Sequence, residues 1–188
     1  MNTTTIIITA VVLAVAVMFA ILVATIAQRK RSERLQGHFG TEYDHTVETM
    51  GDEKKAQTEL DNRQKHVDTL NIRPLSPEER ERYQADWTAM QAKFVDEPRR
   101  ATIEADQLIM EVMQLRDYPV SDFEQRAADI SVNYPVLVTN YRAAQETAIR
   151  NDNHHAGTED LRQAMINYRS VFDELLKTDE VALEIEKV

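Results

Sequence analysis

The organisation of this chain is decided by residues 6–27, IIITAVVLAVAVMFAILVATIA. This segment contains no charged side chain, and Thr9 and Thr25 are its only polar residues. As an α-helix rising about 1.5 Å per residue it would measure about 33 Å, slightly more than the hydrocarbon core of a bilayer, which is about 30 Å thick. We therefore predict a transmembrane helix over residues 6–27, with the lipid bilayer as the first partner of the chain.

A cleaved secretory signal is the competing interpretation of the same segment. Such signals begin with a basic region, have an apolar core of about 7–15 residues and end at a cleavage site of small residues. Residues 1–5, MNTTT, carry no charged side chain, the apolar core is longer, and basic residues follow it at once. We therefore expect an uncleaved anchor, with residues 1–5 as a short extracytoplasmic N-terminus.

The orientation of the anchor is predicted from the basic residues beside it. Four of them follow the apolar segment: Arg29, Lys30, Arg31 and Arg34, here called the basic cluster. The more basic flank of a membrane helix normally stays in the cytoplasm, so we expect the C-terminal domain to be cytoplasmic and residues 28–40 to be a basic juxtamembrane linker. Binding of anionic lipid is an alternative role for the cluster, although four basic residues are the minimum for it.

The charge of the rest of the chain is strongly negative. The formal net charge is −10 at pH 7; residues 29–34 carry +3, which leaves −13 on residues 35–188. A domain this acidic, taken as a whole, is repelled by the phosphates of nucleic acids and by anionic lipid headgroups, so we expect no nucleic-acid partner. The chain has no cysteine, which excludes disulfides and thiolate chemistry.

The remaining sequence predicts helices throughout. The chain has only 4 Gly and 5 Pro among 188 residues, and its apolar residues recur at helical spacing. We expect a polar helical stalk over residues 41–70, with a kink at Gly51 because Gly51 can end a helix and Asp52 can cap the next. A continuous coiled coil is disfavoured because residues 52–59 offer only Ala56 as an apolar position.

Residues 71–188 are predicted to form an acidic helical domain. Helix starts are indicated by Ser76-Pro77-Glu78-Glu79, by Pro98, by Ser121-Asp122-Phe123-Glu124, by Pro135 and by Thr158. The predicted buried faces include Tyr83, Trp87, Met90 and Phe94 in one helix, and Leu137, Tyr141, Ala144 and Ala148 in another. The aromatic stripe could line a ligand site, but at helical spacing it is more typical of a core. The fold class is therefore all-α: the anchor followed by five to six helices in an antiparallel or irregular bundle.

Four groups of residues carry a resemblance to a known family. They are His38-Phe39-Gly40 with Glu42-Tyr43-Asp44, the run Ile72 to Glu78, the run Phe123 to Asp129, and Asp160 to Met165 with Tyr168-Arg169. These stretches resemble a family of short, single-pass, membrane-anchored helical proteins that is common in actinobacteria and usually labelled hypothetical or secreted. The resemblance implies a bacterial plasma membrane and the same architecture, and it transfers no functional residues. The basic cluster predicts a cytoplasmic domain, against the "secreted" label.

Two groups of residues were weighed as metal ligands. Glu42 and His45 have the Glu-x-x-His spacing of di-iron bundles, but a second such motif is missing. His154 and His155 lie near Asp152 in a predicted loop, where histidines are normally solvated. Since the sequence also lacks a Gly-x-Ser-x-Gly elbow, a Gly-rich phosphate loop and a His-Glu-x-x-His motif, we expect no catalytic, cofactor or metal site.

The sequence thus favours a non-enzymatic, membrane-tethered helical interaction or scaffold module with an unidentified protein partner. Two alternatives stay open: an accessory subunit of a larger membrane complex, and a metal-dependent envelope or cytoplasmic enzyme.

Overall fold

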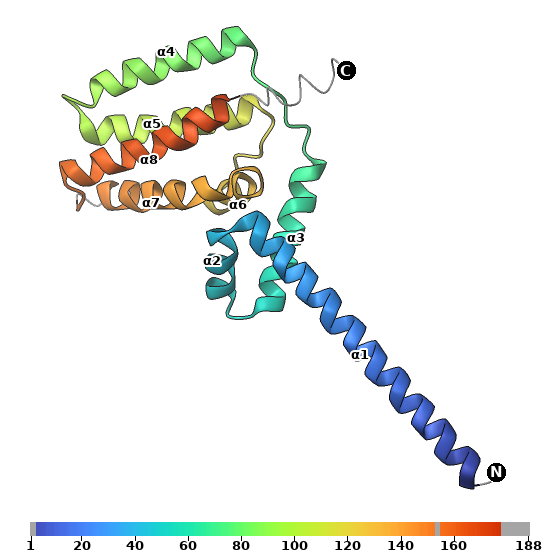
Figure 1. Cartoon of the computed structure of the whole chain (residues 1–188). Helices are drawn as coiled ribbons and strands as arrows, with labels where there is room; N and C mark the ends of the chain where they lie inside the picture. Colours follow the sequence, from blue (N-terminus) through green and yellow to red (C-terminus); the bar gives the residue numbers. More distant parts are fainter. Residues whose placement is uncertain (1–2, 153–154, 178–188) are drawn as a thin grey trace.

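The structure, a computed structural model, describes residues 3–152 and 155–177 (Figure 1). Within these residues the chain forms eight α-helices and no strand, which confirms the all-α class. The helices are α1 (Thr3–Phe39), α2 (Thr41–Met50), α3 (Glu53–Thr69), α4 (Pro77–Lys93), α5 (Pro98–Leu115), α6 (Phe123–Asn133), α7 (Pro135–Asp152) and α8 (Thr158–Leu176).

Helix α1 projects from the rest of the molecule as a single rod (Figure 1). Its described apolar side chains are exposed on all sides between residues 12 and 27. A helix that is apolar all round has no polar face to present to water, which is the pattern of a segment surrounded by lipid or by other protein. Among the described residues, α1 is the one helix long and apolar enough to cross a membrane.

Residues 28–40, expected to be a linker, are helical as far as Phe39. Leu35 and Phe39 lie one turn apart on the same face of α1, and they are only 3% and 1% exposed. Burial of this face keeps the chain helical. Gly37 lies within the helix, and a side chain at this position would meet no neighbouring atom. The helix ends instead at Gly40, whose positive φ of 53° redirects the chain into α2.

Residues 41–70, expected to be a helical stalk with a kink or break at Gly51, form two helices folded back beside the end of α1. Gly51, with a φ of 64°, ends α2, and the side chain of Asp52 caps α3 by accepting the Lys55 N–H at 2.9 Å. A small core holds the three helices together and reaches α6 through Val132. Its buried members are Leu35, Phe39, Tyr43, Leu60, Val67 and Val132. We call residues 28–39 with α2 and α3 the α1–α3 unit.

Helices α4 to α8 surround the main core. The predicted stripe on α4 lies in it: Tyr83, Trp87 and Met90 are buried and Phe94 packs against them. The Trp87 ring stacks on Phe172 of α8 with centroids 4.5 Å apart. Figure 1 shows α4, α5, α8 and α7 side by side, with α6 between α7 and the α1–α3 unit. The bundle and the α1–α3 unit therefore form two adjoining hydrophobic cores.

Most helix starts lie where the sequence predicts them. Ser76 and Glu79 form the complete capping box of α4, and Pro98 and Pro135 begin α5 and α7. Two caps differ from the prediction.

Asp122, not Ser121, caps α6 by accepting the Gln125 N–H at 2.9 Å. At α8 the cap position is Gly157, whose N–H donates to Asp160, so Thr158 is already inside the helix. In both places a carboxylate, a stronger acceptor than a hydroxyl, takes the N–H beside the helix end.

The buried face of α7 is rotated from the predicted one. Val138, Tyr141, Ala144 and Thr147 are buried, whereas Leu137 and Ala148 are half-buried. The rotation follows from packing against both α6 and α8, which lie on different sides of α7.

Candidate functional site

The basic cluster divides into two parts in the structure. Arg34 donates from Nη2 to Asp61 Oδ1 of α3 at 2.7 Å, and Arg31 pairs with the other oxygen of the same carboxylate. Arg31 also donates to the backbone carbonyl of Gln57 at 3.3 Å. Arg29 and Lys30 are exposed and form no ion pair with a described residue. Half of the cluster therefore attaches α1 to α3, and the other half stays available to solvent or ligand.

The fold adds two lysines to this region that the sequence analysis did not select. Lys54 and Lys55 belong to the first turn of α3, which the Gly51-Asp52 reversal returns to the side of α1. A groove of about 450 Å³ separates the two helices there. Its lining is Ala27, Gln28 and Arg31 from α1 with Lys54, Gln57 and Thr58 from α3, here called the α1–α3 groove. The signal in the sequence was the Gly51-Asp52 pair, because a tight reversal there brings the start of α3 back toward the apolar segment.

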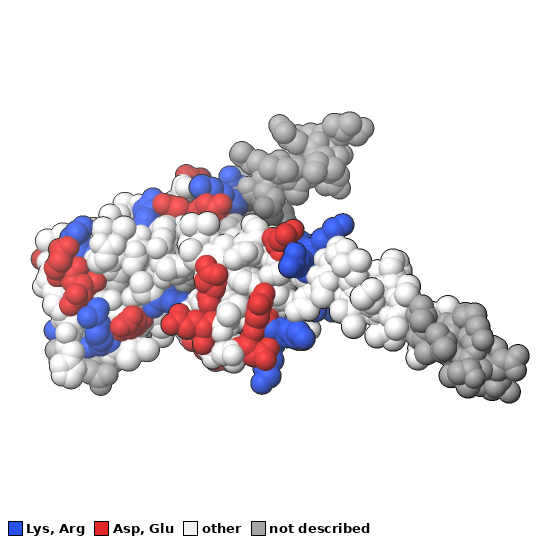
Figure 2. Space-filling view, turned by 60° about the horizontal axis from the view of Figure 1, so that its bottom comes forward, with Lys and Arg blue, Asp and Glu red and all other residues white. Residues whose placement is uncertain are grey.

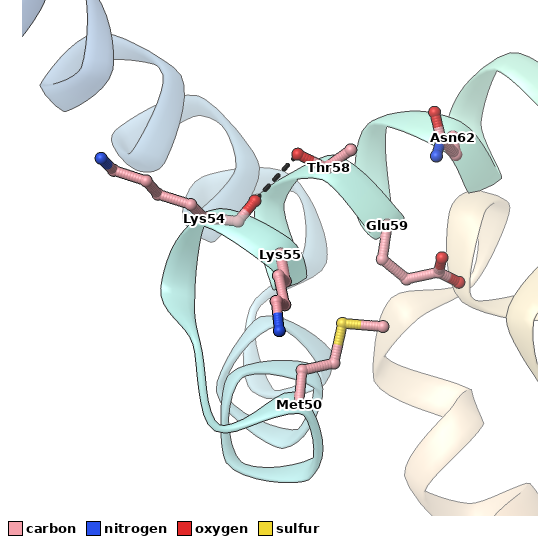
Figure 3. Close-up of a pocket in the computed structure, with 6 residues that line it drawn as sticks. All are labelled: Met50, Lys54, Lys55, Thr58, Glu59 and Asn62. Atoms are coloured by element: carbon pink, nitrogen blue, oxygen red, sulfur yellow. Dashed lines mark hydrogen bonds between the residues drawn. The ribbon is translucent and has the colours of Figure 1, made fainter.

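A second hollow lies on the other side of the first turns of α3 (Figure 3). In this view Lys54 points away from the hollow, while Lys55 points toward the thioether of Met50. The Thr58 hydroxyl donates to the Lys54 carbonyl at 2.8 Å and so belongs to the helix backbone. Lys54 lines both this hollow and the α1–α3 groove, whereas Lys55 lines only the hollow.

A buried ion network joins the α1–α3 unit to the bundle. Glu42 of α2 is 2% exposed, and its Oε1 accepts from Nη1 of Arg63 at 2.8 Å and from Nη2 of Arg142 at 3.0 Å. Arg142 of α7 also donates to Glu124 of α6 at 2.9 Å. Two guanidinium groups on one buried carboxylate offset its charge, which is the condition under which a buried charge is tolerated.

Further ionisable groups lie inside the bundle. Burial raises the pKa of Asp106, and the nearby guanidinium of Arg126 and the hydroxyl of Tyr141 oppose this shift. Burial also raises the pKa of Asp129. Its Oδ1 accepts from Gln125 at 2.8 Å, and its Oδ2 is buried without a hydrogen-bond partner. These groups contact side chains from several helices.

The residues considered as metal ligands are not brought together. Glu42 is held by two arginines, whereas His45 is exposed. His155 is exposed, and His154 lies outside the described residues, as does the side chain of Asp152. In the part of the chain that the structure describes, no three His, Asp or Glu side chains gather as a possible metal site.

Comparison of this chain with known protein families, curated proteins and solved structures finds no match. The geometry of its own residues is therefore what bears on the function of this chain. Two features of that geometry bear on function. The α1–α3 groove lies at the end of the apolar segment, and α1 continues without a break from that segment into a hydrophobic core.

Proposed function

We propose that this chain is a non-enzymatic, membrane-tethered scaffold that holds an acidic helical domain at a set distance and orientation beside a bilayer. One observation carries the proposal: α1 runs without a break from its apolar segment into the core of the α1–α3 unit, where Leu35 and Phe39 are buried. A tether of this kind is an extension of the domain itself. The domain cannot swing freely about it.

The distance between the bilayer and the domain follows from the helix. Ala27 ends the apolar segment and Phe39 reaches the core, so at about 1.5 Å per residue the two lie about 18 Å apart along the axis. The ion pairs of Arg31 and Arg34 with Asp61 hold the same stretch of α1 against α3. A partner in or on the same membrane would therefore meet the domain at high effective concentration and in a narrow range of orientations.

The orientation and membrane remain those predicted from the sequence. Arg29, Lys30, Arg31 and Arg34 support a cytoplasmic domain, with residues 1–5 outside. The family resemblance adds the bacterial plasma membrane. A reporter enzyme fused to the C-terminus should be active in the cytoplasm, and activity only outside it would reverse this orientation.

The partner is proposed to be a protein with a basic surface. Figure 2 shows acidic side chains, interspersed with basic ones, over the domain beside the base of α1, while the described apolar part of α1 is free of both. This distribution suits a protein whose basic side chains complement the carboxylates, and it repels nucleic acid. The non-enzymatic assignment is supported by the use of Glu42 as a buried acceptor for Arg63 and Arg142.

The test compares three forms of the full chain by crosslinking in intact cells. The first is the natural chain, the second has residues 6–27 replaced by an unrelated apolar span of the same length, and the third lacks residues 1–27. A tethered scaffold keeps the same crosslinked partner in the first two forms and loses it in the third. Loss of that partner with the unrelated span would instead assign the chain as an accessory subunit whose membrane helix is itself recognised. Equal capture by all three forms would refute the tethering proposal.

A further inference from the structure

We propose that the α1–α3 groove binds the phosphate headgroup of an anionic membrane lipid. The groove is lined by Ala27, Gln28, Arg31, Lys54, Gln57 and Thr58. This inference rests on the proposed function, because it requires the apolar part of α1 to lie in a bilayer.

The position of the groove selects the lipid headgroup. Ala27 is the last residue of the uncharged apolar segment and is also a lining residue of the groove. When residues 6–27 fill the hydrocarbon core, Ala27 lies at its boundary and Gln28 begins the headgroup layer. The groove therefore opens at the depth where lipid phosphates are found. A soluble anion would have to enter this layer to reach it.

The lining has the charge and donors that a phosphate diester requires. Lys54 of α3 brings an ammonium group and Gln28 of α1 brings an exposed side-chain amide, while the guanidinium of Arg31 adds positive charge but also pairs with Asp61; no carboxylate lines the groove. Lys54 is exposed, and its ammonium group forms no ion pair with a described residue. Donors of this kind form charge-assisted hydrogen bonds to phosphate oxygens.

The neighbouring charges strengthen the site more than they oppose it. Arg29 and Lys30 are exposed nearby and form no ion pairs with described residues. The carboxylate of Glu53 accepts from Ser32, Tyr43 and Gln57, and that of Asp52 caps α3. These two carboxylates accept from protein donors, as does Asp61, which pairs with Arg31 and Arg34, whereas Arg29 and Lys30 are left for a ligand.

A second groove between the same two helices supplies the comparison. It lies farther along them and includes Lys65, but Asp61 and Asp68 also line it. Two carboxylates in the lining repel a phosphate. Lys54 and Lys65 are both exposed residues of α3, separated by about 16 Å along the helix at about 1.5 Å per residue. They therefore make a matched pair in which only one belongs to the proposed site.

The experiment uses the full chain in nanodiscs of phosphatidylcholine with a minor share of phosphatidylglycerol. After release into mild detergent, lipids retained by the chain are identified and counted by native mass spectrometry. The chain should retain phosphatidylglycerol over phosphatidylcholine. Lys54→Gln should lower the retained phosphatidylglycerol about five-fold, the effect of about 1 kcal/mol per basic residue near anionic lipid, and Lys65→Gln should leave it unchanged. Glutamine keeps high helix propensity, so α3 is preserved in both variants.

Three other results would overturn the inference. Equal retention of the two lipids by the natural chain would show that no headgroup is selected, and equal losses in the two variants would show that only net charge matters. If inorganic phosphate, added at the same concentration as the lipid, displaces the bound lipid, the groove is a site for soluble anions. None of these three results contradicts the proposed membrane tether. Release of the chain from phosphatidylcholine vesicles by alkaline carbonate would contradict both the tether and this inference.

Discussion

The Oε1 atom of Glu42, on α2, lies 3.0 Å from Nη2 of Arg142, on α7, and 2.8 Å from Nη1 of Arg63, on α3. One carboxylate oxygen thus links the helices next to the apolar rod with the bundle, between residues 100 positions apart in sequence. Loss of the carboxylate charge should lower the stability of the fold, because the two guanidinium groups then repel each other.

Glu42→Gln should lower the free energy of unfolding by about 2 kcal/mol, less than the 3–5 expected for a fully buried pair because both arginines retain some exposure. The measurement is urea denaturation of the full chain in mild detergent, followed by far-UV circular dichroism. Glu124→Gln is the matched control: it removes another carboxylate bound to Arg142, but one whose side chain is 77% exposed. It should cost less than about 1 kcal/mol. Equal losses in the two variants would contradict the special role of Glu42.

Asp129 should make the chain less stable as the pH rises. Burial raises the pKa of its carboxyl above the ordinary 3.8, so the folded chain holds this proton more tightly than the unfolded chain does. The contribution of Asp129 to the free energy of unfolding therefore falls as the pH rises from 3.8 through the raised pKa, and then levels off.

Asp129→Asn removes this contribution while keeping an acceptor for the Gln125 amide. At pH 7 the variant should be more stable than the natural chain by about 1 kcal/mol, since it no longer buries a charge with one oxygen unpartnered. Denaturation of both chains between pH 4 and pH 7 gives the difference directly, and it should shrink toward the acid end. A difference that is independent of pH would show that the Asp129 carboxyl keeps its ordinary pKa in the folded chain.

The caps at Ser76 and Ser121 provide a second matched pair. The Ser76 hydroxyl accepts the Glu79 N–H at 3.2 Å, whereas the cap of α6 is made by Asp122. Ser76→Ala should therefore destabilise the chain by about 1 kcal/mol, and Ser121→Ala should have little effect. Thermal denaturation compares them. Equal destabilisation by the two substitutions would mean that Ser121 contributes to the start of α6 after all.

Local signals account for the parts of the fold that the sequence predicts well. The Gly51-Asp52 pair marks a helix end and a helix start within two residues, and Ser76-Pro77 does the same for α4. The apolar residues of α8 repeat every three or four positions, which predicts one buried face, and the structure buries all of them: Leu161, Ala164, Met165, Tyr168, Phe172, Leu175 and Leu176. Each of these features depends on residues within a few positions of one another, so a single sequence is enough to identify them.

Long-range contacts account for what the sequence does not predict. Leu35 and Phe39 are covered by Leu60, Val67 and Val132, which lie far from them in sequence. Two apolar residues alone do not indicate a buried helix face, so the sequence did not predict that α1 continues through Gly37. In the same way, the use of Arg31 and Arg34 depends on Asp61, which lies at least 27 residues away. The α1–α3 groove follows from this docking, and only the reversal at Gly51 hinted at it.

The docking of α1 should control how easily its basic cluster is cut by trypsin. Phe39 is 1% exposed in the core of the α1–α3 unit, and truncation of a buried Phe costs about 3–5 kcal/mol. Phe39→Ala should therefore free residues 28–39 from α3 and accelerate cleavage after the arginines of the cluster by about ten-fold or more, because proteolysis follows local opening.

Gln36→Ala, an exposed substitution one turn from residue 39, should be cut at the natural rate. The assay uses the full chain in nanodiscs, with the fragments identified by mass spectrometry. If the natural chain is cut as fast as Phe39→Ala, residues 28–39 are not held against α3 and α1 is a flexible tether. The rigid connection on which the scaffold proposal depends would then be wrong.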